Sequence, residues 1–240
     1  MRYAIFGDIH GNMEALTAVF ADMESARVDR ALCLGDIVGY GAEPEKCIDE
    51  LRGRGIASVI GNHDSAVVGD TPLDYFNDYA REAVVWTADR LSGDDKAYLK
   101  NLPIIGGDGG FITVHSSLAD PTEWRYVINL LAVRRCFDLL TGRLCFIGHS
   151  HVPVIFEECG SITGRRASDV HLDKESRYII NVGSVGQPRD GDCRASYGIY
   201  DEGEMRFEIR RVSYDIGRAQ KKIIEAGLPK SLAFRLGVGR

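Results

Sequence analysis

The sequence predicts an α/β fold in which parallel strand–helix–strand units come first and antiparallel strands follow. Two observations support this prediction. Short apolar runs alternate with helical patterns over the first 65 residues, which favours parallel βαβ units. From about residue 154 the strand-like runs are separated mainly by turns, which is typical of antiparallel pairing. No internal repeat or linker-like segment interrupts the chain, so one domain is expected over residues 1–240.

The first part of the chain predicts three strands and two helices. The runs RYAIFGD (2–8), ALCLGD (31–36) and ASVIGNHD (57–64) are short and continuous, as expected of strands buried on both faces. Asn12 can cap a helix whose apolar residues between 13 and 23 share one face. Pro44 favours the start of a second helix, which ends before Gly55.

The later elements follow from the same patterns. Residues 72–102 predict two helices, at about 74–91 and 94–101, and a Gly-rich turn follows at 106–110. After the run PIIGG and this turn, strands are expected at FITVHSS, RLCFIGHSH, VIFEEC, RYIINVG, ASYGIYD and MRFEIRRV, with a helix near 130–141. The last two strands form a hairpin around Glu202–Gly203, and a helix over about 215–226 stops at Gly227.

Composition excludes several classes of protein. Lys and Arg number 29 against 35 acidic residues, and the net charge of −6 argues against a binder of long nucleic acid or of anionic membranes. No apolar run is long enough to cross a bilayer, and the N-terminus becomes polar too early for a secretory signal. The six cysteines are scattered without a CxxC pair, so reduced thiols and a cytoplasmic location are expected.

Five apolar runs end in side chains that can bind a metal. These side chains are Asp8, His10, Asp36, Asn62, His63, His115, His149 and His151. Because ligands bind beyond the carboxyl ends of parallel strands, we expect these residues to meet at one edge of the sheet. There Asp8, Asp36 and the nearby Asp64 would repel one another without a cation. A mixed His, Asp and Asn set suits Mn, Fe, Co or Zn, and the seven candidates other than His63 are too many for one tetrahedral ion. Two metals that share Asp36 fit the count.

Five motifs resemble those of calcineurin-like metallophosphoesterases. In the family's order they are GDIHGN (7–12), GDIVGYG (35–41), GNHD (61–64), VHSS (114–117) and GHSHVP (148–153). NVGSVGQPRDGD (181–192), the helical segment 72–102 and the C-terminal LPKSLAFRLG resemble a bacterial branch with small phosphodiesterases and dinucleoside-polyphosphate hydrolases. The resemblance implies a four-layer α/β/β/α sandwich with two mixed sheets, and a cap-like insertion at 72–102.

The resemblance also implies a role for each site residue. Asp8, His10 and His151 would hold the first metal, and Asn62, His115 and His149 the second, with Asp36 bridging two divalent ions (Mn, Fe, Zn or Co). A hydroxide between the ions would attack the phosphorus. His63 would protonate the leaving oxygen or stabilise developing charge, and a supporting hydrogen-bond role is the alternative. Arg189 and Asn12 are candidate phosphate contacts; the alternatives are a solvated loop arginine and a helix cap.

One departure narrows the expected substrate. Protein phosphatases of this superfamily carry GDxxDRG, whereas this chain has Gly39 and Tyr40 at the Asp and Arg positions. A phenol does not replace a guanidinium that grips phosphate, so a phosphoprotein phosphatase is disfavoured. We therefore expect a metal-dependent hydrolase of a small phosphate ester, with a phosphodiester or dinucleoside polyphosphate favoured and a nucleotide among the candidates. A nuclease, a phosphomonoesterase and a non-catalytic scaffold, such as the family's retromer subunit, are the alternatives.

The aromatic residues of segment 72–102 allow two interpretations. Tyr75, Phe76, Tyr79 and Trp86 lie at helical spacing, which favours a packed helix face. If one of them faced the metals, it could instead stack on a nucleobase.

Overall fold

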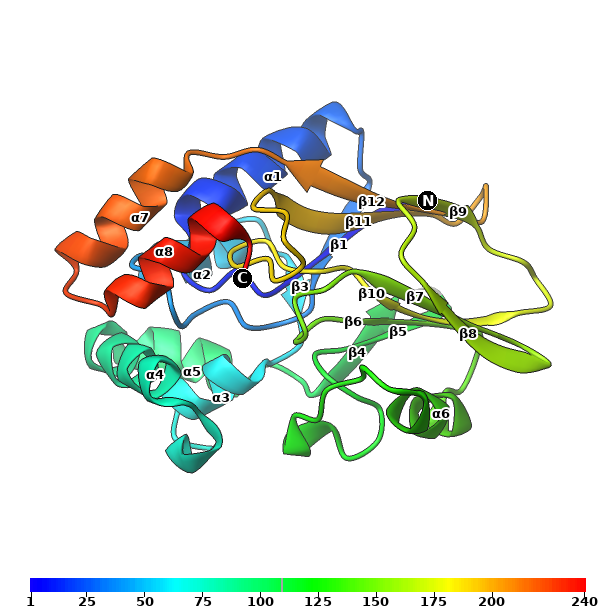
Figure 1. Cartoon of the computed structure of the whole chain (residues 1–240), viewed down its shortest axis with the longest axis horizontal. Coiled ribbons are helices and arrows are strands. Elements are labelled where there is room, and N and C mark those ends of the chain that lie inside the picture. Colours follow the sequence, from blue (N-terminus) through cyan, green and yellow to red (C-terminus); the bar gives the residue numbers. More distant parts are fainter. Residues whose placement is uncertain (109) are drawn as a thin grey trace.

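Two six-stranded mixed sheets lie face to face in the computed structural model, which describes residues 1–108 and 110–240 (Figure 1). The first sheet has the strand order β3–β2–β1–β11–β12–β9. Its strands are β1 (Arg2–Phe6), β2 (Arg30–Cys33), β3 (Ala57–Ser58), β9 (Asp169–His171), β11 (Ala195–Asp201) and β12 (Arg206–Val212). β1, β2 and β3 are parallel, and the other pairs are antiparallel, as the sequence predicts.

The second sheet has the order β4–β5–β6–β10–β7–β8. Its strands are β4 (Ile105–Asp108), β5 (Phe111–Val114), β6 (Leu144–Ile147), β7 (Val154–Cys159), β8 (Ser161–Arg165) and β10 (Arg177–Asn181). β6 pairs in parallel with both β5 and β10, whereas the outer pairs are antiparallel. The turn predicted at 106–110 is wrong for residues 106–108, which belong to β4, and residue 109 lies outside the described residues.

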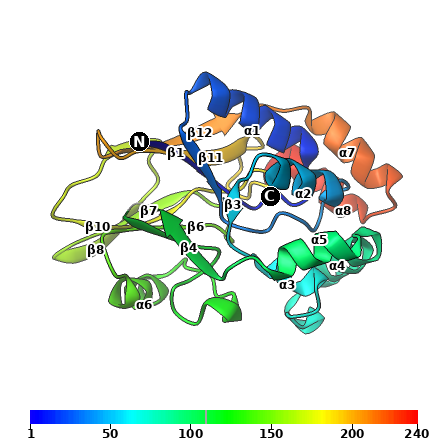
Figure 2. The same cartoon turned by 180° about the vertical axis from the view of Figure 1, so that it is seen from behind.

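Helices cover the outer face of each sheet, which completes four layers (Figures 1 and 2). They are α1 (Met13–Ser25), α2 (Pro44–Gly53), α3 (Asn62–Val67), α4 (Asp78–Arg90), α5 (Gly93–Lys100), α6 (Leu130–Leu139), α7 (Ile216–Glu225) and α8 (Lys230–Val238). Only α6 among them packs on the outer face of the second sheet, through Val133 and Phe137. The predicted α/β/β/α sandwich is therefore confirmed.

Side chains along each strand point alternately to the two faces of its sheet, and both faces are covered by an apolar layer. This explains why the strands are continuous hydrophobic runs. On β1, Ala4 and Phe6 face the core under the helices of the first sheet, whereas Tyr3 and Ile5 face the space between the two sheets. Phe146 on β6 meets them there from the second sheet. Each sheet is thus buried on both faces, and its strand ends are left to form the site.

Two predicted elements need correction near the site. The strand expected at 57–64 ends at Ser58, and the chain turns at Gly61 into α3, which begins at Asn62. The helix expected from 74 begins at Asp78 because the Asn77 side chain caps it by accepting a hydrogen bond from Ala80 N at 3.0 Å. A single 3₁₀ turn over residues 73–75 precedes it.

Several further elements were not predicted, among them β4, β8, β9 and α8. β8 is an edge strand with exposed, polar residues, and β9 has three residues, so neither carries an apolar alternation. α8 follows Pro229 and contains Gly237, which weakens its helical pattern. All six cysteines are free. Among the described residues, no helix is long and apolar enough to span a membrane.

An ion pair fastens α1 to the first sheet. The Asp22 carboxylate accepts hydrogen bonds from Arg210 Nε at 3.0 Å, Arg210 Nη2 at 2.9 Å and Tyr197 Oη at 2.7 Å. The Arg210 guanidinium holds the pKa of Asp22 below its usual value. The folded protein therefore keeps this carboxylate charged to lower pH than the unfolded chain does, so its stabilising effect is present above about pH 5 and fades in acid.

We expect Asp22→Asn to lower the free energy of unfolding at pH 7 by about 1 kcal/mol, because the pair is partly exposed. The difference from the wild type should shrink as the pH falls towards about 3. Urea unfolding of both chelator-treated proteins across this range measures it. Asp138→Asn, at an exposed position of α6, is the matched control. A difference that is constant with pH would contradict the role of the carboxylate charge.

Candidate metal centre

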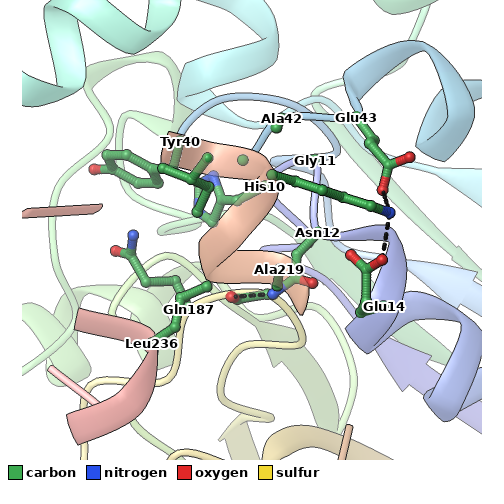
Figure 3. A pocket seen from close by; sticks show the side chains of 14 residues that line it. His10, Gly11, Asn12, Glu14, Tyr40, Ala42, Glu43, Gln187, Ala219 and Leu236 are labelled. Carbon is green, nitrogen blue, oxygen red and sulfur yellow. Dashed lines mark hydrogen bonds and ion pairs between the residues drawn. The ribbon is translucent and has the colours of Figure 1, made fainter. Parts of the chain in front are cut away.

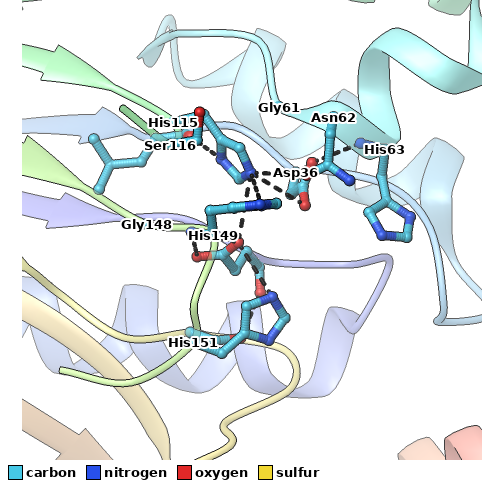
Figure 4. A network of polar contacts seen from close by, with 12 residues as sticks. Asp36, Gly61, Asn62, His63, His115, Ser116, Gly148, His149 and His151 are labelled. Atoms are coloured by element: carbon cyan, nitrogen blue, oxygen red, sulfur yellow. Dashed lines mark hydrogen bonds and ion pairs between the residues drawn. The ribbon is translucent and has the colours of Figure 1, made fainter. Parts of the chain in front are cut away.

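The predicted ligands converge where β1 and β2 of one sheet and β5 and β6 of the other end (Figure 4). The sequence pattern placed them at one edge of a single sheet, but they come from both sheets and from the start of α3. The side chains of Asp8, His10, Asp36, His63, His115, His149 and His151 are all buried, as is that of Asn62.

The first group contains Asp8, His10, Asp36 and His151, whose ligand atoms all lie within 4.8 Å of one another. His10 Nε2 is 3.1 Å from His151 Nε2 and 3.6 Å from Asp36 Oδ2. His151 Nε2 is 3.3 Å from Asp8 Oδ1. Atoms that share one ion at about 2.1 Å lie about 3–3.5 Å apart, so these separations fit a common cation.

The second group contains Asp36, His115 and His149, again within 4.8 Å of one another. His115 Nε2 lies 3.2 Å from His149 Nδ1, 3.1 Å from Asn62 Oδ1 and 3.4 Å from Asp36 Oδ2. Asp36 Oδ2 is therefore close to both groups. It is the atom that a pair of ions would share.

Four histidines belong to the two ligand groups. In each of them, the ring nitrogen that points away from the other ligands faces a main-chain carbonyl. The pairs are His10 Nδ1 with Val38 O at 3.1 Å, His115 Nδ1 with Leu34 O at 2.7 Å, His151 Nδ1 with Gln187 O at 2.6 Å, and His149 Nε2 with Trp124 O at 2.7 Å. Each ring donates its N–H outward, so its inner nitrogen presents a lone pair. Two such lone pairs 3.1 or 3.2 Å apart repel each other unless a cation lies between them. The donor set thus fits divalent metal.

The charges of the site also favour a bound cation. Burial opposes a positive charge on the His115 ring, yet the charges of Asp36 and Asp8 outweigh it and raise the pKa of His115 to about 9. Burial lowers the pKa of the adjacent His149 to about 3. The two carboxylates therefore demand positive charge at this place, and a divalent cation supplies it.

Five candidate ligands adopt the left-handed backbone conformation. They are Asp8, His10, Asp36, His149 and His151, with φ between 51° and 67°. Residues other than glycine rarely adopt this region, and the cost is accepted mainly at functional sites. Gly61 allows the close approach of a neighbouring loop, because a Cβ there would lie 2.1 Å from Asp36 Oδ1. The ligand loops are held in one strained arrangement.

Asp64 accepts hydrogen bonds from the main chain and belongs to neither ligand group. Its Oδ1 accepts hydrogen bonds from Ile37 N at 2.9 Å and Val38 N at 3.1 Å, and its Oδ2 accepts one from Gly61 N at 3.0 Å. It thereby joins the loop after β2 to the loop before α3. The ligand groups therefore contain two carboxylates, Asp8 and Asp36, while burial and the charge of Asp36 raise the pKa of Asp64 to about 7.

His63 lies at the side of the centre, packed among aromatic rings. Its ring centroid is 4.4 Å from that of Tyr40, 4.8 Å from His10 and 4.9 Å from Phe76. A Cβ at Gly39 would come within 2.4 Å of His63 Nδ1, which has no hydrogen-bond partner among the described residues. Burial lowers the pKa of His63 to about 4. Gly39 therefore leaves room for the His63 ring. Protein phosphatases have the first Asp after the GD of GDxxDRG at this position.

A cavity of about 130 Å³ opens over Asp36 and His63. Residues Tyr75, Phe76, Asn77 and Ala80 line it, so part of segment 72–102 faces the centre. Tyr75 is exposed, and Phe76 is buried against His63. The helix-face interpretation thus holds for Trp86, which packs at the edge of the core and donates Nε1–H to Ala226 O, but not for Tyr75.

Arg189 also lines the cavity. Its guanidinium lies over the Tyr40 ring, and Nη2 donates to Gln187 Oε1 at 2.9 Å and to Tyr40 Oη at 3.3 Å. Within residues 1–108 and 110–240, no carboxylate lies within 4.0 Å of it. Arg189 is therefore oriented by neutral groups and keeps its charge available to an anion in the cavity.

Asn12 lines a second, smaller pocket together with Tyr40 and Leu236 (Figure 3). Its Oδ1 accepts from Ala15 N at 3.1 Å, and its Nδ2 donates to Gly186 O at 2.9 Å. The predicted helix cap is therefore confirmed. The phosphate contact stays a prediction, with both polar atoms of the amide engaged by the main chain.

Several residues of the site were missed from the sequence. Trp124 supplies the carbonyl that orients His149, and Tyr126 stacks on the same ring with a centroid distance of 4.2 Å. Gln187 supplies the carbonyl for His151. Any residue type can supply a main-chain carbonyl, so residue types alone do not identify these positions. Only the Gly-rich turn GSVGQP, which contains Gln187, indicated a functional loop.

Comparison with known proteins agrees with this geometry. A family model described as the calcineurin-like phosphoesterase superfamily domain matches residues 1–205. An uncharacterised protein of Methanocaldococcus jannaschii is 41% identical over 241 residues, which cover 99% of this chain and 98% of that protein. A metallophosphoesterase structure from Sphaerobacter thermophilus has a TM-score of 0.88 at 41% identity, covering 100% of this chain and 99% of that one. A hypothetical protein from Pyrococcus horikoshii shares the fold, with a TM-score of 0.82 at 18% identity, covering 100% and 98%.

Proposed function

This chain belongs to the calcineurin-like phosphoesterase superfamily, and on that premise we propose that it hydrolyses a small phosphodiester or dinucleoside polyphosphate at a two-metal centre. Membership and the buried cluster make it a metal-dependent phosphoric ester hydrolase. The number of metals, the role of each residue and the kind of ester are our proposals. So are the cytoplasmic location and a single domain over residues 1–240 in which segment 72–102 forms a cap.

The proposal of two ions depends mainly on Asp36. Its Oδ2 lies near His10 Nε2 and near His115 Nε2, at 3.6 and 3.4 Å. Asp8, His10 and His151 would hold one ion and Asn62, His115 and His149 the other, with Asp36 shared. Bound divalent cations, of which Mn, Fe, Zn and Co suit these donors, would activate water and neutralise phosphoryl oxygens.

The residues around the centre are suited to bind and orient a phosphoryl group. Arg189 can donate two N–H groups to a phosphoryl oxygen without breaking an ion pair. His63, which also lines the cavity, can donate to the leaving oxygen or stabilise its charge. The buried rings of Phe76 and Trp124 give the cavity apolar wall beside the reacting group.

The cavity walls favour an ester with organic substituents. Tyr75, Trp124 and Tyr126 give it apolar surface, and Tyr40 occupies the place at which protein phosphatases have a phosphate-gripping arginine. A dianionic phosphoprotein would lack that contact. A diester presents less charge and more apolar surface, which these walls accommodate.

The proposal is tested by loading the chelator-treated protein with Mn, Fe, Zn or Co. Bound metal is counted, and kcat/KM is measured on bis(p-nitrophenyl) phosphate, p-nitrophenyl phosphate, dinucleoside polyphosphates and a phosphopeptide. We expect about two ions per chain and the highest kcat/KM on a diester or polyphosphate. Fewer than one ion per chain, together with no turnover of any ester, would refute the proposal.

Salt dependence separates a nuclease from an enzyme of small esters. Binding to a nucleic-acid polymer releases counterions and weakens steeply as salt rises. With a net charge of −6, we expect kcat/KM to change little between low and moderate salt. A steep loss on oligonucleotides, together with their preference over small esters, would favour the nuclease.

A further inference from the structure

Gln187 contacts both a candidate metal ligand and the arginine of the cavity. Its main-chain oxygen accepts the hydrogen bond from His151 Nδ1 at 2.6 Å. Its side-chain Oε1 accepts hydrogen bonds from Arg189 Nη2 at 2.9 Å and from Arg189 Nε at 3.3 Å. Two neighbouring N–H groups of one guanidinium therefore converge on a single oxygen, which fixes the plane of the guanidinium as well as its position.

The loop that carries Gln187 is held tightly against the first ligand loop. Gly186 N and Ser184 Oγ both donate hydrogen bonds to Asp8 O, each at 2.9 Å. Gln187 N donates to Ser184 Oγ at 2.8 Å. A Cβ at Gly186 would lie only 1.8 Å from Ile9 O, so the two main chains are in direct contact. Because its main chain is fixed to the ligand loop, Gln187 can hold a neighbouring side chain at a constant position relative to the ligands.

The side chain of Gln187 orients Arg189 without neutralising it. A half-buried arginine most often pairs with a carboxylate, and such a pair would compete with the phosphate of a substrate. The acceptors here are the amide oxygen and the Tyr40 hydroxyl, which is 3.3 Å from Nη2, and both are uncharged. Over residues 1–108 and 110–240, Nη1 of Arg189 makes no hydrogen bond. The guanidinium therefore keeps its full charge and a free donor group, and it belongs to a residue that lines the cavity.

The other end of the Gln187 amide has no partner. Nε2 is buried and makes no hydrogen bond among the described residues. The atom that faces Arg189 must be the amide oxygen, since a guanidinium can only donate. A buried donor without a partner destabilises a fold, and an apolar side chain of the same shape would serve packing better. The presence of an amide at this position is therefore explained by its oxygen.

We propose that Gln187 is a positioning residue for the reaction, whose Oε1 directs Arg189 into the cavity at a fixed place beside the metal ligands. This inference rests on the proposed function, in which Arg189 binds a phosphoryl oxygen. A guanidinium that binds the phosphate equally in the ground state and in the transition state lowers KM and leaves kcat almost unchanged. Gln187 should therefore affect KM, through Arg189, and not the number of bound ions.

The test compares Gln187→Met with the wild type on bis(p-nitrophenyl) phosphate, with the same metal in both proteins. Methionine has a similar length but only a weak acceptor, so Arg189 loses two hydrogen bonds while the main-chain contact with His151 remains. We expect Q187M to raise KM about tenfold, to change kcat by less than about threefold and to keep its ions. Gln220→Met is the matched control, because Gln220 is the chain's other glutamine and its Nε2 donates to Ala233 O at 2.9 Å, between α7 and α8. It should leave KM unchanged.

A double-mutant cycle shows whether Gln187 acts through Arg189. In an Arg189→Gln background the guanidinium is absent, so the addition of Q187M should change KM by less than about twofold. Gln187→Glu places a carboxylate against the guanidinium, and the resulting ion pair should raise KM at least as much as Q187M does. Equal losses from Q187M in both backgrounds, or a Q187E variant with the KM of the wild type, would overturn the positioning role.

Stability separates positioning from packing. Since Q187M removes an unpaired buried donor, the chelator-treated variant should unfold at the urea concentration of the wild type or at a higher one. A lower midpoint together with an unchanged KM would make Gln187 a packing residue and overturn the proposal. If Q187M does not fold, Gln187→Asn gives the same comparison, because its shorter amide cannot reach the guanidinium.

Calorimetry with inorganic phosphate measures anion binding to the metal-loaded protein without turnover. Q187M should weaken this binding by a factor similar to the rise in KM, and equal phosphate affinities of Q187M and the wild type would contradict the role of Gln187. A wild type that hydrolyses none of the esters would refute the proposed function, and the phosphate affinities would still decide whether Gln187 positions Arg189.

Discussion

Asp36→Asn is expected to lower kcat/KM on bis(p-nitrophenyl) phosphate by at least about a thousandfold, because the carboxylate shared by both ligand groups is lost. Asp36 Oδ2 is close to the inner nitrogens of His10 and His115, at 3.6 and 3.4 Å. An amide carries no charge and binds a divalent ion weakly. We expect the bound metal to fall from about two ions per chain to one or fewer.

The fold should survive this substitution. Asp36 Oδ1 accepts a hydrogen bond from His63 N at 2.8 Å, which an Asn oxygen can also accept. Circular dichroism and metal analysis on the same preparation separate loss of the ions from unfolding. Asp49→Asn, on the exposed side of α2, makes the same chemical change away from the site and should leave activity unchanged. If D36N kept two ions and most of its activity, Asp36 would not be the shared ligand.

The same variant distinguishes an enzyme from a scaffold of this fold. A scaffold would keep its partner binding in D36N, since its function would not depend on the ions. If the protein is an enzyme, D36N would lose its phosphoesterase activity. Fold alone cannot make this distinction, because one architecture hosts many functions.

Most ligand positions were predictable because they lie just beyond the ends of β1, β2, β5 and β6, whereas Asn62 lies at the start of α3. On β1, β2 and β6, an apolar run is followed by Gly and then by Asp or His, so the local pattern places the ligand at the strand end. The strand–turn geometry is local, and it requires little from the rest of the chain. The pairing of these strands into two sheets is a long-range property. It came from the family resemblance and not from the runs themselves.

Other parts of the site had no such local pattern. α3 replaces the end of a predicted strand because Asp64 can accept hydrogen bonds from Gly61, Ile37 and Val38, the last two in a loop that is distant in sequence. α8, whose Leu236 lines the small pocket beside Asn12, is a Gly-containing helix, and its position depends on contacts with the 187–192 loop. Tertiary contacts decide both cases, and sequence periodicity does not report them.

His63→Asn is expected to lower kcat by about a hundredfold to a thousandfold while the two ions are retained. His63 approaches the centre from α3 and is not a member of either ligand group. Its ring is fixed by Tyr40 and Phe76, at 4.4 and 4.9 Å, so an Asn side chain cannot reach the same place. Steady-state kinetics and metal analysis measure both effects. His171→Asn, on the exposed edge strand β9, is the control.

The role of His63 is resolved by varying the leaving group. If the imidazole protonates the leaving oxygen, the loss in H63N should grow as the leaving alcohol becomes less acidic, because proton transfer then matters more. If it only stabilises developing charge, aryl and alkyl esters should lose similar factors. Gly39→Ala should reproduce part of the loss without touching the ring chemically, since its Cβ would lie 2.4 Å from His63 Nδ1. Loss of metal in H63N would contradict both roles and make His63 a support for the ligand loops.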